Sequence, residues 1–220
     1  NNIVQHWLNG FKVVEYERKS NIFKVLVAHS KHAKWNGFTL TDLVFPTFLF
    51  IVGNSMSFSM NKYETLSNSS VVSKIVKRTL ILFLLGFLMY WFPFFENGQL
   101  KPVNHTRIFG VLQRIALCYF FAAILLRFFK TKTVVLFSVL ALIGYHLIMV
   151  AFGDLSLSGN AVLQLDTMLI GADHMYHGDG IAFDPEGLLS TLPAIVNCIA
   201  GYWAGVYLQK EGQNYKTIAI

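Results

Sequence analysis

Long apolar stretches without a charged side chain alternate with short polar segments along this chain. Stretches that contain no Asp, Glu, Lys or Arg include residues 79–95, 133–152 and 187–208. An α-helix needs about 17 to 25 such residues to cross the hydrocarbon core of a membrane. The pattern therefore predicts an all-α protein, a polytopic bundle of transmembrane helices.

The pattern predicts five spans when stretches that hold up to three charges are included. We expect them at about residues 41–60, 75–95, 107–129, 132–152 and 187–209. Residues 1–40 are then a loop segment, residues 153–186 a long polar loop, and residues 210–220 the start of a further segment. This arrangement indicates a piece of a longer membrane protein.

Composition agrees with a membrane protein. The chain is 54% hydrophobic and 14% charged, whereas soluble domains carry about 25% charged residues. Gly201 and Gly205 form a pair of small residues four apart, which predicts close packing on another helix. Cys118 and Cys198 both fall in apolar spans, so we expect small hydrophobic side chains rather than a disulfide.

Basic residues are distributed unevenly between the loops on the two sides of the predicted bundle. The loops after the first, third and fifth spans hold nine Lys and Arg, and the opposite loops hold only Lys101 and Arg107. The positive-inside rule then assigns the first set to the cytoplasm, although six Lys and Arg in residues 1–40 oppose this orientation. We interpret the net charge of +6 as loop charge that sets orientation, not as a nucleic-acid surface.

The opposite, outer side collects groups that transfer protons or accept hydrogen bonds. Six of the seven histidines lie there or at its rim, and the 153–186 loop holds six carboxylates, at positions 154, 166, 173, 179, 184 and 186. Asp173, His174, His177 and Asp179 have a spacing that a metal ion could use, but no third strong ligand is fixed. We expect a glycine-rich loop and no metal site.

A histidine, an Asn-Gly pair and an aspartate are crowded just before the first span. They are His32, Asn36 and Asp42, and ionisable groups at this depth are costly enough to indicate a functional site. Thr39 and Asp42 also fit a capping box, so Asp42 either caps the helix or orients a neighbouring base. A neutral imidazole at position 32 could act as nucleophile or general base.

Two arginines and two carboxylates form the second group of candidates. Arg107 and Arg114 are seven residues apart, which predicts one helix face about two turns apart. A buried guanidinium needs a partner, and Asp42, Asp184 or Glu186 are candidates. Asp184 and Glu186 also fit a helix start, with Asp as the cap and a proline in the first turn. Ion pairing and ligand contact both stay open for these residues.

Three segments of the chain together resemble one family of membrane enzymes. HAKWNGFTLTDLVFP at 32–46, RIFGVLQRIA at 107–116 and FDPEGLLSTLP at 183–193 are similar, in the same order, to signature blocks of the heparan-alpha-glucosaminide N-acetyltransferase family and its bacterial relatives. The first helix of that family, with a Ser-Leu-Asp and Arg-Gly type motif, has no counterpart in this chain.

The resemblance implies a membrane acetyltransferase that takes acetyl from cytoplasmic acetyl-CoA and delivers it to an amino sugar or glycan on the other side. It implies that His32 is the active histidine, either general base or acetyl carrier, with Asn36 and Asp42 shaping its site. Arg107, Arg114, Asp184 and Glu186 would bind substrate or support the site. We also expect membrane lipid as a neighbour, the inner membrane of a bacterium as the location, and a homo-oligomer as one possible assembly.

A transporter of a small polar solute is the alternative from a different functional class. In that hypothesis Asp42, Arg114 and His146 line a polar path, and His146 is central because it lies in the middle of a predicted span. It predicts solute flux without acetyl-CoA. A scaffold without catalysis would leave the crowded histidines and acids unexplained.

Overall fold

The structure is a computed structural model that describes residues 25, 27–33, 35, 37–96, 98–178 and 180–212. The chain divides into two compact units, Asn1–Phe45 and Pro46–Ile220. In the described part of the first unit, a short 3-10 helix, η1 (Leu40–Leu43), leads directly into the long helix α3 (Val44–Tyr63), which continues into the second unit. Each unit is described separately below.

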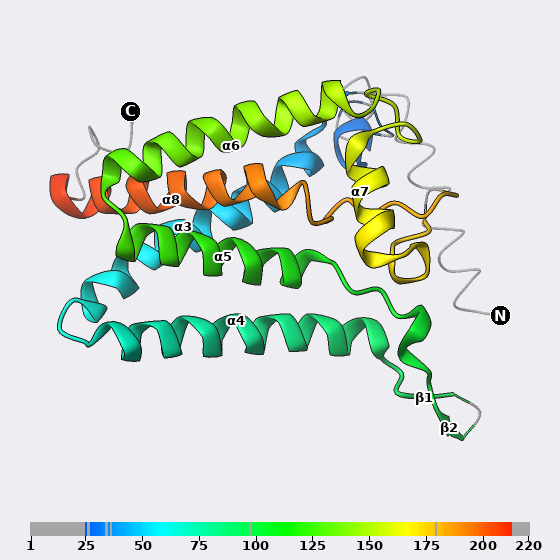
Figure 1. The fold of residues 1–220 in the computed structure, drawn as a ribbon, viewed down its shortest axis with the longest axis horizontal. Helices are drawn as coiled ribbons and strands as arrows, with labels where there is room; N and C mark the ends of the chain where they lie inside the picture. Colours follow the sequence, from blue (N-terminus) through cyan, green and yellow to red (C-terminus); the bar gives the residue numbers. More distant parts are fainter. Residues whose placement is uncertain are drawn as a thin grey trace. The chain divides into compact units, whose positions relative to one another are not determined.

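The second unit is built from long helices, as the apolar pattern predicts. After α3 come α4 (Asn68–Trp91), α5 (Val111–Phe128), α6 (Thr131–Ala151), the shorter α7 (Ala161–Ile170) and α8 (Thr191–Glu211). A small hairpin of β1 (Phe95–Glu96) and β2 (Gln99–Leu100), with the 3-10 turns η2 (Val103–His105) and η3 (Ala172–His174), completes the described elements. Figure 1 shows α4, α5, α8 and α6 lying side by side, with α7 across their ends.

Four helical segments are long and apolar enough to cross a membrane: Leu40–Tyr63, Val111–Phe128, Thr131–Ala151 and Thr191–Glu211. Only 17% of the most apolar window of Thr131–Ala151 is buried inside the protein, and large apolar side chains such as Leu136, Leu140 and Leu147 point outward from it. In water so much exposed apolar surface would be unfavourable. The chain is therefore an integral membrane protein with a helical fold.

The helix boundaries differ from the predicted spans at several points. The helix that follows Arg107 begins at Val111, because Gly110 is extended, so Arg107 does not share a helix with Arg114 as predicted. The last helix begins at Thr191, so Asp184 is not its cap. The predicted loop 153–186 contains α7, whose first turn is capped by the Asn160 side chain. The span predicted at 75–95 corresponds to α4, which begins earlier, at Asn68, carries Lys74, Lys77 and Arg78 in its first half and is not among the four apolar segments.

Small residues allow α3 and α8 to pack with their backbones in contact. A Cβ added at Gly201 would overlap the carbonyl of Phe50, and one at Gly53 would overlap the carbonyl of Cys198. Farther along the same pair, the Asn61 amide donates to Gln209 at 2.8 Å. Near the other end of the pair the Asn197 side chain donates to the Pro46 carbonyl, so both helices advance in the same direction and run parallel. The close packing predicted from Gly201 and Gly205 is confirmed.

We expect Gly201→Ala to lower the free energy of unfolding by about 1–3 kcal/mol, because the added methyl forces the two backbones apart. Gly144→Ala is the matched control, since nothing lies within 4 Å of a Cβ at that helical position. There alanine should be neutral or stabilise by up to about 1 kcal/mol. Thermal unfolding of both variants in the same detergent measures the difference. Equal midpoints for the two variants would contradict the close approach.

Candidate active site

His32 and Asp42 form a hydrogen-bonded pair in the first unit. The Nδ1 atom of His32 lies 2.8 Å from Oδ1 of Asp42, and the His32 side chain is 74% exposed. An ionised carboxylate can only accept, so Nδ1 carries the proton and the neutral ring presents Nε2 as a base or nucleophile. The geometry thus orients an accessible imidazole for chemistry at Nε2.

Asp42 performs both roles that the sequence left open. Its second oxygen, Oδ2, accepts from the backbone N–H of Thr39 at 2.8 Å and from the Thr39 hydroxyl at 2.9 Å. These bonds belong to the capping box at the start of η1, while Oδ1 holds His32. The cap therefore fixes the carboxylate that fixes the histidine. Asn36, the third candidate in this segment, lies outside the described residues.

The second unit contains an ion cluster around Arg107, in the extended segment before α5. The guanidinium donates through Nε and one terminal nitrogen to both oxygens of Asp184, at 3.1 and 2.5 Å. The same terminal nitrogen contacts Glu186 at 2.5 Å, and the other donates to the Tyr90 hydroxyl at 3.2 Å. Asp184 and Glu186, which the sequence offered as partners for the deeper Arg114 or for both arginines, thus pair here with Arg107.

Two aromatic rings complete the surroundings of Arg107. The Tyr90 ring from α4 and the Tyr176 ring from the loop after η3 lie 5.0 and 5.1 Å from the guanidinium carbon, at cation–π distance. Gly110 allows Tyr90 to come this close, because a Cβ there would overlap the Tyr90 ring. Neither tyrosine was a candidate from sequence, since both belong to segments distant in the chain from Arg107.

Arg107 stays cationic in this environment. Burial by itself would lower the pKa of the guanidinium, but the hydrogen bonds and charges of Asp184 and Glu186 raise the pKa above its ordinary value. Asp184 is completely buried, and its charge is matched by Arg107. Arg107 thus faces two carboxylates, and the positive charge of Arg114 also acts on both of them.

Arg114 lies in the first turn of α5 and is buried. It donates to the carbonyl of Gly187 at 3.3 Å and to the Ser190 hydroxyl. These partners belong to the turn that carries Asp184 and Glu186, so both arginines hold the same segment. We name residues 184–190 the acidic turn.

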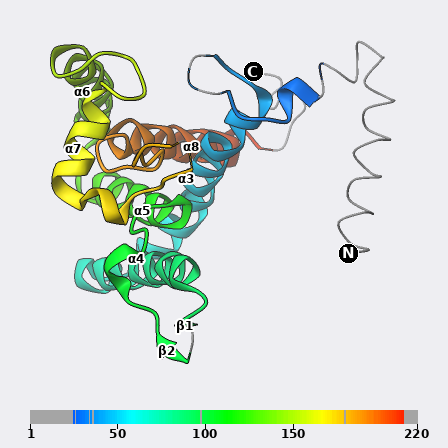
Figure 2. The same cartoon turned by 90° about the vertical axis from the view of Figure 1, so that its right-hand side faces the viewer.

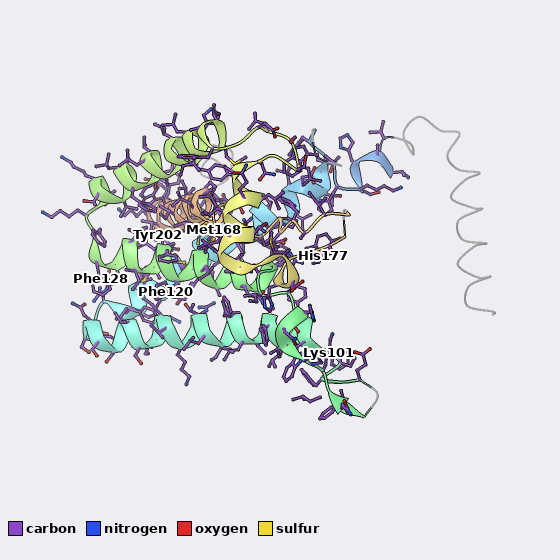
Figure 3. All side chains as sticks on the ribbon, turned by 45° about the vertical axis from the view of Figure 1, so that its right-hand side comes forward. Lys101, Phe120, Phe128, Met168, His177 and Tyr202 are labelled. Atoms are coloured by element: carbon purple, nitrogen blue, oxygen red, sulfur yellow. The ribbon has the colours of Figure 1, made fainter. Side chains whose placement is uncertain are left out.

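The histidines of the proposed metal motif have other partners. His174 directs Nδ1 to the Thr106 carbonyl at 2.9 Å, and the Ile108 N–H donates to the His174 carbonyl at 3.1 Å. His177, marked in Figure 3, directs Nδ1 to the Met175 carbonyl at 2.9 Å. Asp179 lies outside the described residues. The His174 contacts anchor the segment that carries Arg107.

The six described candidates thus form two groups, one in each unit. His32 pairs with Asp42, and Arg107, Arg114, Asp184 and Glu186 are joined through the acidic turn. In the sequence, the motif segments 107–116 and 183–193 pointed to the residues of the second group. The packing of α4 and α7 around it carried no sequence signal.

Comparison with known proteins identifies the family. A family model described as "Heparan-alpha-glucosaminide N-acetyltransferase, catalytic" matches residues 20–170. The chain belongs to this family. The matched region contains His32, Asp42, Arg107 and Arg114, whereas Asp184 and Glu186 lie beyond it.

Two curated members of the heparan-alpha-glucosaminide N-acetyltransferase family extend the similarity. The heparan-alpha-glucosaminide N-acetyltransferase of Mus musculus is 31% identical over 231 residues, which cover 81% of this chain and 34% of that protein. The Homo sapiens protein of the same name is 30% identical over 242 residues, covering 86% of this chain and 36% of its own length. The chain therefore spans about a third of the length of these relatives.

We expect Arg107→Ala to lower the free energy of unfolding by about 3–5 kcal/mol, because it leaves the Asp184 carboxylate buried without its cation. Arg127→Ala is the control, since Arg127 donates only to the Asn68 side chain at the exposed surface in the bonds described. Adding Asp184→Asn to Arg107→Ala should restore part of the loss. Equal unfolding midpoints for the two single arginine variants would contradict the buried ion pair.

Proposed function

We propose that this chain belongs to the catalytic part of a membrane acetyltransferase. The enzyme transfers acetyl from cytoplasmic acetyl-CoA to the amino group of an amino sugar or glycan on the other side of the membrane. The observation that carries the proposal is the pair of His32 and Asp42, 2.8 Å apart, in a chain that belongs to an N-acetyltransferase family.

The exposed Nε2 of His32 supports two routes. As a general base, Nε2 removes a proton from the sugar amine while the amine nitrogen attacks the thioester carbonyl, and the CoA thiolate leaves. As an acetyl carrier, Nε2 attacks the thioester carbon itself, the thiolate leaves, and the amine then displaces the imidazole. In both routes Asp42 holds the ring and stabilises the positive charge that develops on it.

The ion cluster supports a role in binding the acceptor. Glu186 is 17% exposed beside Arg107, and its carboxylate oxygens can accept hydrogen bonds from an ammonium group or from sugar hydroxyls. The Tyr176 side chain is 39% exposed beside Arg107 and offers an aromatic surface. We assign Glu186 to acceptor binding, Asp184, Arg107 and Arg114 to the support of Glu186, and Asn36 to the shape of the His32 site.

Charge at the two ends of the helical bundle supports the direction of transfer. Lys74, Lys77 and Arg78 belong to the first half of α4, and Lys130 and Lys132 flank the start of α6. The Arg107 cluster lies at the other end, where α4 ends and α5 begins. A helix of 21 residues such as α6 is about 30 Å long, so the ends can face opposite sides of a membrane. We assign the basic end to the cytoplasm and to the phosphates of CoA.

His32→Ala in the full-length protein should reduce transfer of labelled acetyl to a panel of amino sugars to below about 1% of wild type, because no other group replaces Nε2. His146→Ala, in the middle of α6, is the control and should retain transfer. Membranes incubated with labelled acetyl-CoA provide the measurement. Full turnover in the His32 variant would refute the assignment, and solute flux that depends on His146 would favour a transporter.

Asp42→Asn should lower kcat by about 10²- to 10⁴-fold, because an amide no longer holds the Nδ1-protonated tautomer of His32. Thr39→Ala separates this effect from capping, since it removes a donor to Oδ2 and leaves the His32 bond to Oδ1. That variant should lose some stability and keep kcat within a few-fold of wild type. Equal kcat losses in the two variants would assign Asp42 to the cap alone.

A further inference from the structure

Asp166 is a buried carboxylate that neither the family resemblance nor the spacing of motifs singled out. It lies in α7 with no exposed surface. Its Oδ1 accepts from the backbone N–H groups of Leu188 and Leu189, at 3.0 and 3.4 Å. Its Oδ2 is buried and has no hydrogen-bond partner within the described part of the chain. Burial of a carboxylate oxygen without a hydrogen-bond partner lowers the stability of the fold, so its presence calls for an explanation.

Both hydrogen bonds that Asp166 accepts come from the acidic turn. Leu188 and Leu189 belong to the same turn as Asp184 and Glu186, which bind Arg107. The carbonyl of Gly187, which lies between Glu186 and Leu188, accepts hydrogen bonds from Arg114, from the Ser190 hydroxyl at 3.1 Å and from the Thr191 hydroxyl at 2.9 Å. The turn is therefore held from α5 through its carbonyl and from α7 through its amides.

Gly187 and Asp166 fit each other closely. A Cβ added at Gly187 would overlap Oδ2 of Asp166. The backbone of Gly187 lies outside the left-handed region, so the need for glycine there is one of space. Asp166 cannot rotate away to make room without breaking its bonds to Leu188 and Leu189. The carboxylate thus fixes the position of the turn by contact as well as by hydrogen bonds.

The two hydrogen bonds to the turn need an acceptor oxygen on Asp166 and not a charge. Burial raises the pKa of Asp166 above its ordinary value, and the amides of Leu189 and Leu188 oppose the rise. An amide oxygen accepts the same two hydrogen bonds without a charge. Asparagine is therefore the conservative replacement, and alanine is the one that removes the acceptor.

We propose that Asp166 is a positioning residue that holds the acidic turn, and with it Asp184 and Glu186, in the geometry that binds the acceptor. The proposal rests on the acceptor-binding role assigned to that turn above. It extends the site to α7, shown across the ends of the long helices in Figure 2. Asp166 acts through the turn and does not itself touch the substrate.

The test measures acetyl transfer by the full-length protein with separate titrations of acetyl-CoA and of the amino-sugar acceptor. Asp166→Ala should raise the KM for the acceptor by about 10-fold, because one buried acceptor of two hydrogen bonds is lost, and leave the KM for acetyl-CoA unchanged. Asp166→Asn should restore the acceptor KM to within about threefold of wild type. Asp173→Ala, at an exposed aspartate seven residues on, should match wild type. Equal changes in both KM values, or none, would overturn the proposal.

A second measurement does not depend on activity. Gly187→Ala should lower the unfolding midpoint in detergent, and by half or less of that amount when Asp166 is already alanine, because the methyl then has room. Equal losses in the two backgrounds would refute the contact on which the proposal rests. If wild type transfers no acetyl to any amino sugar while this coupling is observed, the proposed function fails and the hold of Asp166 on the turn stands.

Discussion

The ion pair between Arg107 and Asp184 is the constraint on which the end of the bundle depends. Burying an ionised carboxylate is costly unless its oxygens are satisfied, and the planar guanidinium satisfies both oxygens of Asp184 at 2.5 and 3.1 Å. To form this pair, the segment before α5 must meet the segment before α8, which is 77 residues away in sequence. The pair thus joins the starts of two helices.

The surrounding contacts each hold one side of that junction. His174 anchors the segment of Arg107 through the Thr106 carbonyl, Tyr90 and Tyr176 enclose the guanidinium, and Asp166 holds the amides after Glu186. The cluster is rigid because these partners come from separate elements, each fixed by the packing of helices. A rigid group of this kind is suited to presenting a carboxylate to a polar substrate.

The His32 pair follows a different principle, because it is built from local structure. A capping box at the start of η1 holds Asp42, and the freed carboxylate oxygen holds a histidine ten residues earlier. Oδ1 of Asp42 bonds to His32 and Oδ2 bonds to Thr39, so the same side chain can cap the helix and orient the histidine. Such an arrangement holds the imidazole in one tautomer without burying it.

The sequence by itself determined the helical membrane fold, the capping box at Asp42 and the small residues where α8 packs on α3. These features depend on spacing of a few residues along one segment, which is visible in the letters of the chain. It also indicated the residues of both candidate groups, through motif context. The tertiary structure decided that Arg107 stands outside the helix of Arg114, that Asp184 pairs with Arg107 and does not cap, and that Tyr90, Tyr176 and Asp166 belong with them. Those contacts join residues between 17 and 79 positions apart, so only the packing of the helices could select them.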